Sequence, residues 1–95
     1  MKIVYTEEAR QDLEGIAEFR FANYPAIASK VEARIRAVVD FIARWPKSSR
    51  RTRGGSSVRS APLGRYPYVI FYRLIGDTVE ILYIHHAARR PPDDV

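Results

Sequence analysis

Two neighbouring apolar segments near the C-terminus constrain the fold more than any other feature of the chain. Residues 68–74 read YVIFYRL and residues 79–84 read VEILYI, and the intervening IGDT is typical of a tight turn between two strands. Alternate side chains of a strand point to opposite faces of a sheet. Both faces of this hairpin are therefore predicted to be largely apolar.

The predicted faces can be assigned residue by residue from this alternation. One face of the first strand is expected to carry Val69, Phe71 and Arg73, and the other Tyr68, Ile70, Tyr72 and Leu74. On the last strand, Val79, Ile81 and Tyr83 are expected to oppose Leu82 and Ile84.

The rest of the chain predicts two helices and two weaker strands around this hairpin. Residues 2–5 (KIVY) are typical of a short strand, and Thr6 offers a hydroxyl that can cap a helix starting directly after it. The NYP motif at 23–25 should break the helical run, because proline suits the first position of a new helix, which Pro46 then ends. Residues 46–57 are expected to be a loop. Residues 58–63 are expected to be a weak strand that is interrupted by Pro62, so it either lies near an edge of the sheet or ends at this proline.

Apolar residues recur at three-and-four spacing in both predicted helices, which is typical of one buried stripe on each. In the first helix they are Ala9, Leu13, Ile16, Ala17, Phe21 and Tyr24. In the second they are Ala28, Val31, Ile35, Val38, Ile42 and Trp45. We expect an antiparallel helical hairpin with merging apolar faces, packed on a mainly antiparallel sheet in the order β-α-α-β-β-β.

This α+β arrangement leaves a prediction about partners. One helical hairpin covers one face of a sheet, and the residues after Arg90 are too few to cover the other. Large apolar patches on soluble proteins usually mark interaction surfaces. A polypeptide partner is therefore expected on the second face. The alternative is an ordinary solvent-exposed sheet face, on which the tyrosines keep their hydroxyls in water beside the aliphatic parts of the arginines.

The size and composition limit the class of protein. At 95 residues the chain is expected to form a single domain, residues 1–95. Without cysteine it has no disulfide framework, thiolate metal site or cysteine nucleophile. No apolar run approaches the length of a membrane span and no signal peptide is recognisable, so a cytoplasmic location is expected.

The net charge of +5 is concentrated in one part of the chain. Residues 44–73 hold eight basic and no acidic residues, whereas the segments on either side are slightly acidic. This basic segment predicts a surface for an anionic partner, either nucleic acid or an acidic polypeptide. The alternative is a solvated loop whose arginine content reflects coding bias.

Few residues offer catalytic chemistry. His85 and His86 are adjacent, so a strand would send them to opposite faces; they cannot form a pair, and no metal site or cofactor is expected. One of them could act as a general acid or base, although a partly buried histidine at a strand end is the simpler interpretation. Arginines on or beside the strands could grip phosphate or carboxylate, as a metal-free ribonuclease would require.

Four stretches of the chain together resemble the ParE/RelE superfamily of bacterial toxin–antitoxin toxins. They are IVYTEEARQDLEGI, the NYP break with a helix ending FIARWP, VRSAPLGRYPYVIFYRL, and VEILYIHHAARRPP. LGRYPYVIFYR and the His-x-x-Arg close are most similar to the ParE branch. The resemblance implies a type II toxin that inhibits DNA gyrase, with roles in plasmid stabilisation or stress response, and an acidic ParD-like antitoxin that wraps and neutralises it.

The RelE branch, which cleaves mRNA on the ribosome, remains the alternative. Its members are implied to use an arginine where this chain has Val69, and a tyrosine or histidine near the C-terminus. If this protein were such a ribonuclease, Arg89, His86 and Arg73 would be its catalytic residues. Loss of a preorganised cation typically costs about 3 kcal/mol in the transition state, so Val69 favours a non-catalytic toxin. A toxin-like module without remaining toxicity is a third possibility.

The residues expected to bind the partner combine the basic segment with the tyrosines and histidines of the hairpin. They are Arg59, Arg65, Tyr66, Tyr68, Arg73, Tyr83, His86 and Arg89.

Overall fold

The computed structural model describes residues 1–52 and 57–87, apart from the side chains of Arg20 and Phe21. The elements follow in the order β1 (Lys2–Tyr5), α1 (Glu7–Asn23), α2 (Pro25–Arg44), β2 (Arg50–Arg51), β3 (Arg59–Pro62), β4 (Tyr68–Ile75) and β5 (Thr78–His86). The predicted α+β class and element order are confirmed. The exception is β2, a two-residue strand within the segment that was predicted to be a loop.

The strands form one five-stranded sheet in the order β1-β5-β4-β3-β2. The first strand pairs in parallel with the last, and the other neighbours are antiparallel. Pro62 ends β3, where its missing N–H removes no central ladder bond. The predicted hairpin turn is present at residues 76–77, where Gly76 has a φ of 60°, a conformation that glycine adopts without strain.

Local sequence signals set the helix boundaries. The Thr6 hydroxyl accepts a hydrogen bond from the Ala9 N–H at 3.0 Å, as expected for a helix cap. Pro25 opens α2 without losing a helical hydrogen bond. None of the helices in the described residues is long and apolar enough to cross a membrane.

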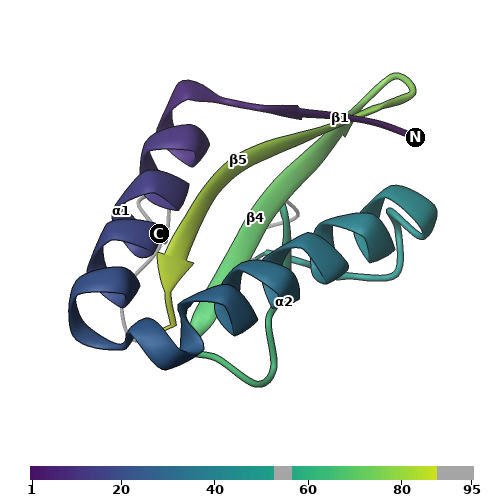
Figure 1. The fold of residues 1–95 in the computed structure, drawn as a ribbon. Helices are drawn as coiled ribbons and strands as arrows, with labels where there is room; N and C mark the ends of the chain where they lie inside the picture. Colours follow the sequence, from purple (N-terminus) through teal and green to yellow (C-terminus); the bar gives the residue numbers. More distant parts are fainter. Residues whose placement is uncertain (53–56, 88–95) are drawn as a thin grey trace.

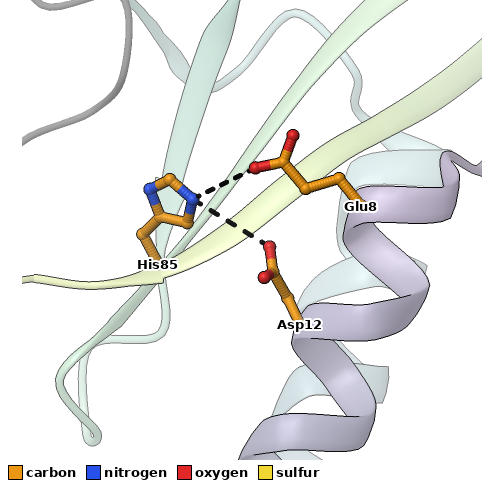
Figure 2. Close-up of side chains that lie close together, drawn as sticks. All are labelled: Glu8, Asp12 and His85. Atoms are coloured by element: carbon orange, nitrogen blue, oxygen red, sulfur yellow. Dashed lines mark ion pairs between the residues drawn. The ribbon is translucent and has the colours of Figure 1, made fainter.

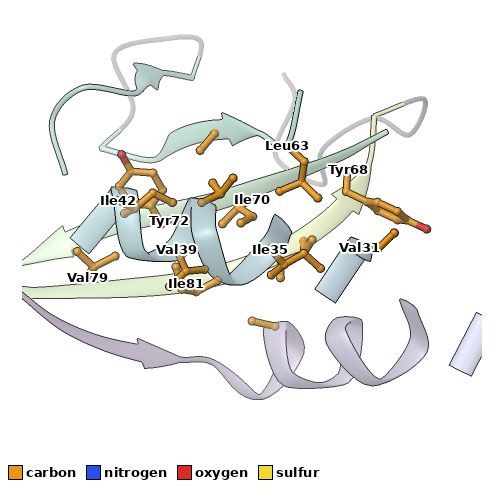
Figure 3. Close-up of a cluster of buried hydrophobic side chains, with 14 residues drawn as sticks. Val31, Ile35, Val39, Ile42, Leu63, Tyr68, Ile70, Tyr72, Val79 and Ile81 are labelled. Carbon is orange, nitrogen blue, oxygen red and sulfur yellow. The ribbon is translucent and has the colours of Figure 1, made fainter. Parts of the chain in front are cut away.

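The core lies between α2 and the sheet (Figures 1 and 3). The buried residues of α2 are Ala28, Val31, Ile35, Val38, Val39 and Ile42, as the spacing predicted with the addition of Val39. They pack with strand residues that include Ile70, Tyr72 and Ile81, each fully buried. Trp45 is 57% exposed, so its predicted place in the seam is wrong; the helix ends at Arg44 and Trp45 leaves the helical conformation.

The first helix lies beside the edge of β5 rather than across the sheet (Figure 1). Of its predicted stripe, Ala9 is fully buried, Leu13 and Ile16 are half-buried, and Ala17 and Tyr24 are exposed. The position of Phe21 falls among the side chains that are not described. The stripe of α1 is thus only partly used inside the fold.

Candidate functional site: an apolar groove and a histidine–carboxylate cluster

The two helices diverge from the NYP break (Figure 1). Side chains of both helices and of β1 line a groove between them. The groove has a volume of about 560 Å³ and is lined by residues of β1, α1 and α2. Its apolar lining comprises Ile3, Leu13, Ile16, Ala17, Ala28, Val31, Ile35 and Val39. The predicted merging of the two helical faces is therefore wrong over this groove.

Polar groups gather along one part of the groove. Tyr5, Arg36 and Asp40 line it beside the apolar residues. Burial raises the pKa of the Tyr5 hydroxyl, nearby Asp40 raises the pKa further, and Arg36 opposes this shift. The site thus offers an apolar floor with a few polar groups at its rim, a composition suited to an amphipathic polypeptide segment.

The second face of the hairpin is not the open apolar surface that was predicted. Phe71 and His85 are only 6% and 5% exposed, and Tyr83 stacks on His85 with 4.6 Å between the ring centroids. Phe71 contacts the same two rings, at 5.0 Å from Tyr83 and 6.0 Å from His85. Among the described residues, one apolar surface that remains open lies in the helical groove.

A β-bulge explains why the face assignment fails on the last strand. Phe71 pairs with Tyr83 and Tyr72 with Ile81, so Leu82 is an extra residue of β5. Beyond the bulge the alternation is shifted by one position. Ile84 joins Val79 and Ile81 in the core, whereas Tyr83, predicted to share their face, lies with Phe71 and His85.

The sequence-predicted partner residues of the 59–68 segment have different environments. Arg59 donates hydrogen bonds from its guanidinium to the carbonyls of Ser49 at 2.7 Å and Lys47 at 3.4 Å. Arg65 is exposed, Tyr66 packs against the core, and Tyr68 is 7% exposed. Arg65 is thus the member of this group that a partner reaches most easily.

The residues predicted for the ribonuclease alternative are not all brought together. Arg73 lies opposite Glu80 and donates to its carboxylate at 2.7 Å, whereas His86 lies opposite Tyr68, whose ring it contacts edge-on. Arg73 and Tyr68, the residue opposite His86, are five positions apart along β4, which corresponds to about 16 Å of strand. Arg89 lies outside the described residues.

The basic segment follows the sheet edge opposite α1. Arg44, Lys47, Arg50, Arg51 and Arg65 are exposed, and Arg50 and Arg51 form β2, the last strand on that side. The groove adjoins β1, at the other end of the sheet order. A partner that uses both surfaces must therefore wrap around the molecule.

His85 is a buried histidine of β5, and two carboxylates of α1 face it (Figure 2). Its Nε2 atom lies 3.6 Å from Glu8 Oε2 and 4.0 Å from Asp12 Oδ2. These three residues form a group that could hold a metal ion. The sequence did not indicate this group, because Glu8 and Asp12 come from a helix that meets His85 only in the folded chain.

Two helices on a five-stranded, mostly antiparallel sheet define a small α+β protein, and its surface carries an apolar groove. The family described as "ParE toxin of type II toxin-antitoxin system, parDE" matches residues 3–91. The protein therefore belongs to the ParE toxin family, within the ParE/RelE superfamily of type II toxins.

Relatives and solved structures agree with this assignment. A Sinorhizobium fredii protein named as a toxin, Y4kP, is 37% identical over 91 residues, covering 96% of this chain and 93% of the relative. Toxin RelE2 of Caulobacter vibrioides is 30% identical over 88 residues, covering 93% and 97%. A solved structure of the chromosomal ParDE toxin–antitoxin system of P. aeruginosa has a TM-score of 0.78 and 25% identity, with 90% and 95% covered.

Proposed function

We propose that this toxin inhibits DNA gyrase and is neutralised by direct binding of a ParD-like antitoxin. The observation that carries the choice of target is the register of β4 and β5. It holds Arg73 against Glu80, about 16 Å along the strand from His86, so these two residues cannot act on one phosphate. Val69, at the position of the ribonuclease arginine, supplies no cation.

A RelE-like, ribosome-dependent mRNA endonuclease is the second candidate, favoured by the identity to RelE2. The two targets are separated by assaying the purified toxin on both. We expect loss of gyrase supercoiling with accumulation of cleaved DNA, and no cleavage of mRNA on programmed ribosomes. The reverse result would reject gyrase as the target, and neither activity would identify a toxin-like module without toxicity.

The antitoxin is proposed to place an amphipathic helix in the groove and an acidic segment along the basic edge. The groove supplies apolar surface that the chain leaves uncovered, and the exposed cations of the 44–65 stretch attract an acidic chain. The molecule measures 37 × 29 × 24 Å. A segment that wraps around the molecule follows a path longer than its 29 Å width, so the part of the antitoxin that joins the two surfaces must exceed about nine extended residues at roughly 3.3 Å each.

A pair of matched substitutions tests the groove. Ala17 and Ala33 are both exposed helical residues, but only Ala17 lines the groove. Ala17→Arg should weaken binding of the antitoxin encoded beside the toxin at least tenfold, whereas Ala33→Arg should not. Arginine attracts an acidic partner, so a loss reports obstruction of the groove rather than repulsion.

Isothermal titration calorimetry on the two purified variants gives this comparison directly. Equal affinities for Ala17→Arg and Ala33→Arg would exclude the groove as the antitoxin site. Gyrase inhibition by both free variants then reports separately on the target, because the proposed gyrase activity does not depend on where the antitoxin binds.

A further inference from the structure

His85 is a buried imidazole without a hydrogen bond at either ring nitrogen from the part of the chain that the structure describes. Its side chain is 5% exposed, and the buried Nδ1 atom has no hydrogen-bond partner among those residues. Nε2 faces carboxylate oxygens at 3.6 and 4.0 Å, beyond hydrogen-bond distance. Nδ1 points away from the carboxylates, so Nε2 is the ring nitrogen that a ligand shared with Glu8 and Asp12 would satisfy (Figure 2). A buried polar atom without a partner is costly, which favours such a shared ligand at Nε2.

The distances around Nε2 suit ligands of a shared cation. Zinc lies about 2.0–2.2 Å from imidazole nitrogen and carboxylate oxygen, so two ligands of a tetrahedral ion lie about 3.4 Å apart. The two contacts of Nε2, at 3.6 and 4.0 Å, are slightly longer than this spacing, and all three ligand atoms lie within 4.8 Å of one another. The Glu8 side chain is 56% exposed and can rotate to close the remaining difference.

The helix that carries the two carboxylates is held in place by its docking on β5. Glu8 and Asp12 are four residues apart and therefore lie on one face of the helix. Asp12 Oδ2 accepts a hydrogen bond from the Ile84 N–H at 2.9 Å, and the Thr6 hydroxyl donates to the Leu82 carbonyl at 2.6 Å. A hydrogen bond that orients a carboxylate in this way is typical of the surroundings of metal ligands.

We propose that Glu8, Asp12 and His85 form a binding site for a divalent cation of the zinc class. One imidazole with two carboxylates suits Zn²⁺ or Co²⁺, whereas Ca²⁺ and Mg²⁺ prefer oxygen ligands alone. Three protein ligands leave a fourth position for water. The bound ion connects α1 to β5, the two elements that carry its ligands (Figure 2).

Zinc titration of tag-free protein tests this site. The unmodified protein should bind one Zn²⁺ per chain in calorimetry, and Co²⁺ should give a visible absorption band typical of a protein-bound ion. Glu8→Gln and His85→Gln should each weaken Zn²⁺ binding at least tenfold, since even residues that only orient a ligand contribute tenfold or more to affinity. Glu14→Gln, on the same helix outside the cluster, and His86→Gln, the neighbouring histidine, should bind like the unmodified protein.

The Glu8→Gln variant keeps the test decisive if His85→Gln fails to fold, because the Glu8 side chain is exposed and contributes little to the core. Zn²⁺ should raise the melting temperature of the unmodified protein and of Glu14→Gln, but not of Glu8→Gln. Absence of saturable binding would overturn the proposal and leave His85 as an imidazole between two carboxylates. If His86→Gln weakened Zn²⁺ binding as much as His85→Gln, the proposal would also be overturned, because the ion would then bind to an exposed histidine outside the cluster.

Discussion

The two helices have similar apolar periodicity in the sequence but bury it to very different extents. α2 crosses the sheet and buries six residues in the core. Among the described side chains of α1, Ala9 is buried, and Leu13 and Ile16 are half-buried. Leu13, Ile16 and Ala17 of the α1 stripe line the groove, so one helix completes the fold and the other leaves apolar surface uncovered.

This difference follows from where each helix docks. α2 packs its apolar face on the centre of the sheet. In contrast, α1 is attached to the edge of β5 that lies beyond its pairing with β1. There the Thr6 hydroxyl donates to the Leu82 carbonyl, and Asp12 accepts from the Ile84 N–H. An edge gives a helix anchoring points but little apolar area. Polar anchoring therefore replaces part of the hydrophobic burial in α1.

Truncation of one isoleucine on each helix should show the largest difference. Ile42 on α2 is fully buried, so Ile42→Ala should lower the free energy of unfolding by about 2–5 kcal/mol. Ile16 on α1 is half-buried beside the groove, so Ile16→Ala should cost clearly less. Urea denaturation measures both values, and a cost for Ile16→Ala as large as that for Ile42→Ala would contradict the comparison.

Removal of the Thr6 hydroxyl should test the polar anchoring of α1. Thr6 Oγ1 accepts from the Ala9 N–H and donates to the carbonyl of the bulged Leu82. Thr6→Ala should lower the free energy of unfolding by about 1–2 kcal/mol, the range of strong helix caps. Thr6→Ser keeps the hydroxyl and should retain most of the stability. Equal losses for alanine and serine in the same denaturation assay would show that the methyl group, not the anchor, matters.

Sequence reasoning predicted the features that depend on neighbouring residues. Thr6 caps α1 within one turn, Pro25 opens α2, and the glycine turn at residues 76–77 joins the long strands. Each of these signals acts through local backbone geometry, so no knowledge of the tertiary contacts is required. The element order followed from them.

The features that were missed depend on contacts between distant segments. The bulge at Leu82 is supported by a hydrogen bond from Thr6, 76 residues away, and it reverses the face on which Tyr83 lies. The Glu8 and Asp12 carboxylates meet His85 only because the edge of β5 receives α1. Periodicity identifies which helix residues are apolar, but not whether the sheet is placed to cover them.

Tyr5 should report the state of the groove through a small pH effect. Burial, reinforced by Asp40 and opposed by Arg36, raises the pKa of its hydroxyl above the ordinary value of about 10. The neutral form is thus favoured in the folded state. Its contribution to stability is present below about pH 10 and is lost as the pH rises through the pKa of the folded state.

Tyr5→Phe should therefore lose less stability than the unmodified protein as the pH rises above about 10, measured by urea denaturation at each pH. The effect should be small because Tyr5 is 43% exposed, and solvent screens much of the interaction. Other tyrosines and lysines titrate equally in both proteins, so their contribution cancels in the difference. Identical pH profiles would mean that the Tyr5 hydroxyl is fully hydrated and that the groove is wetter than its apolar lining indicates.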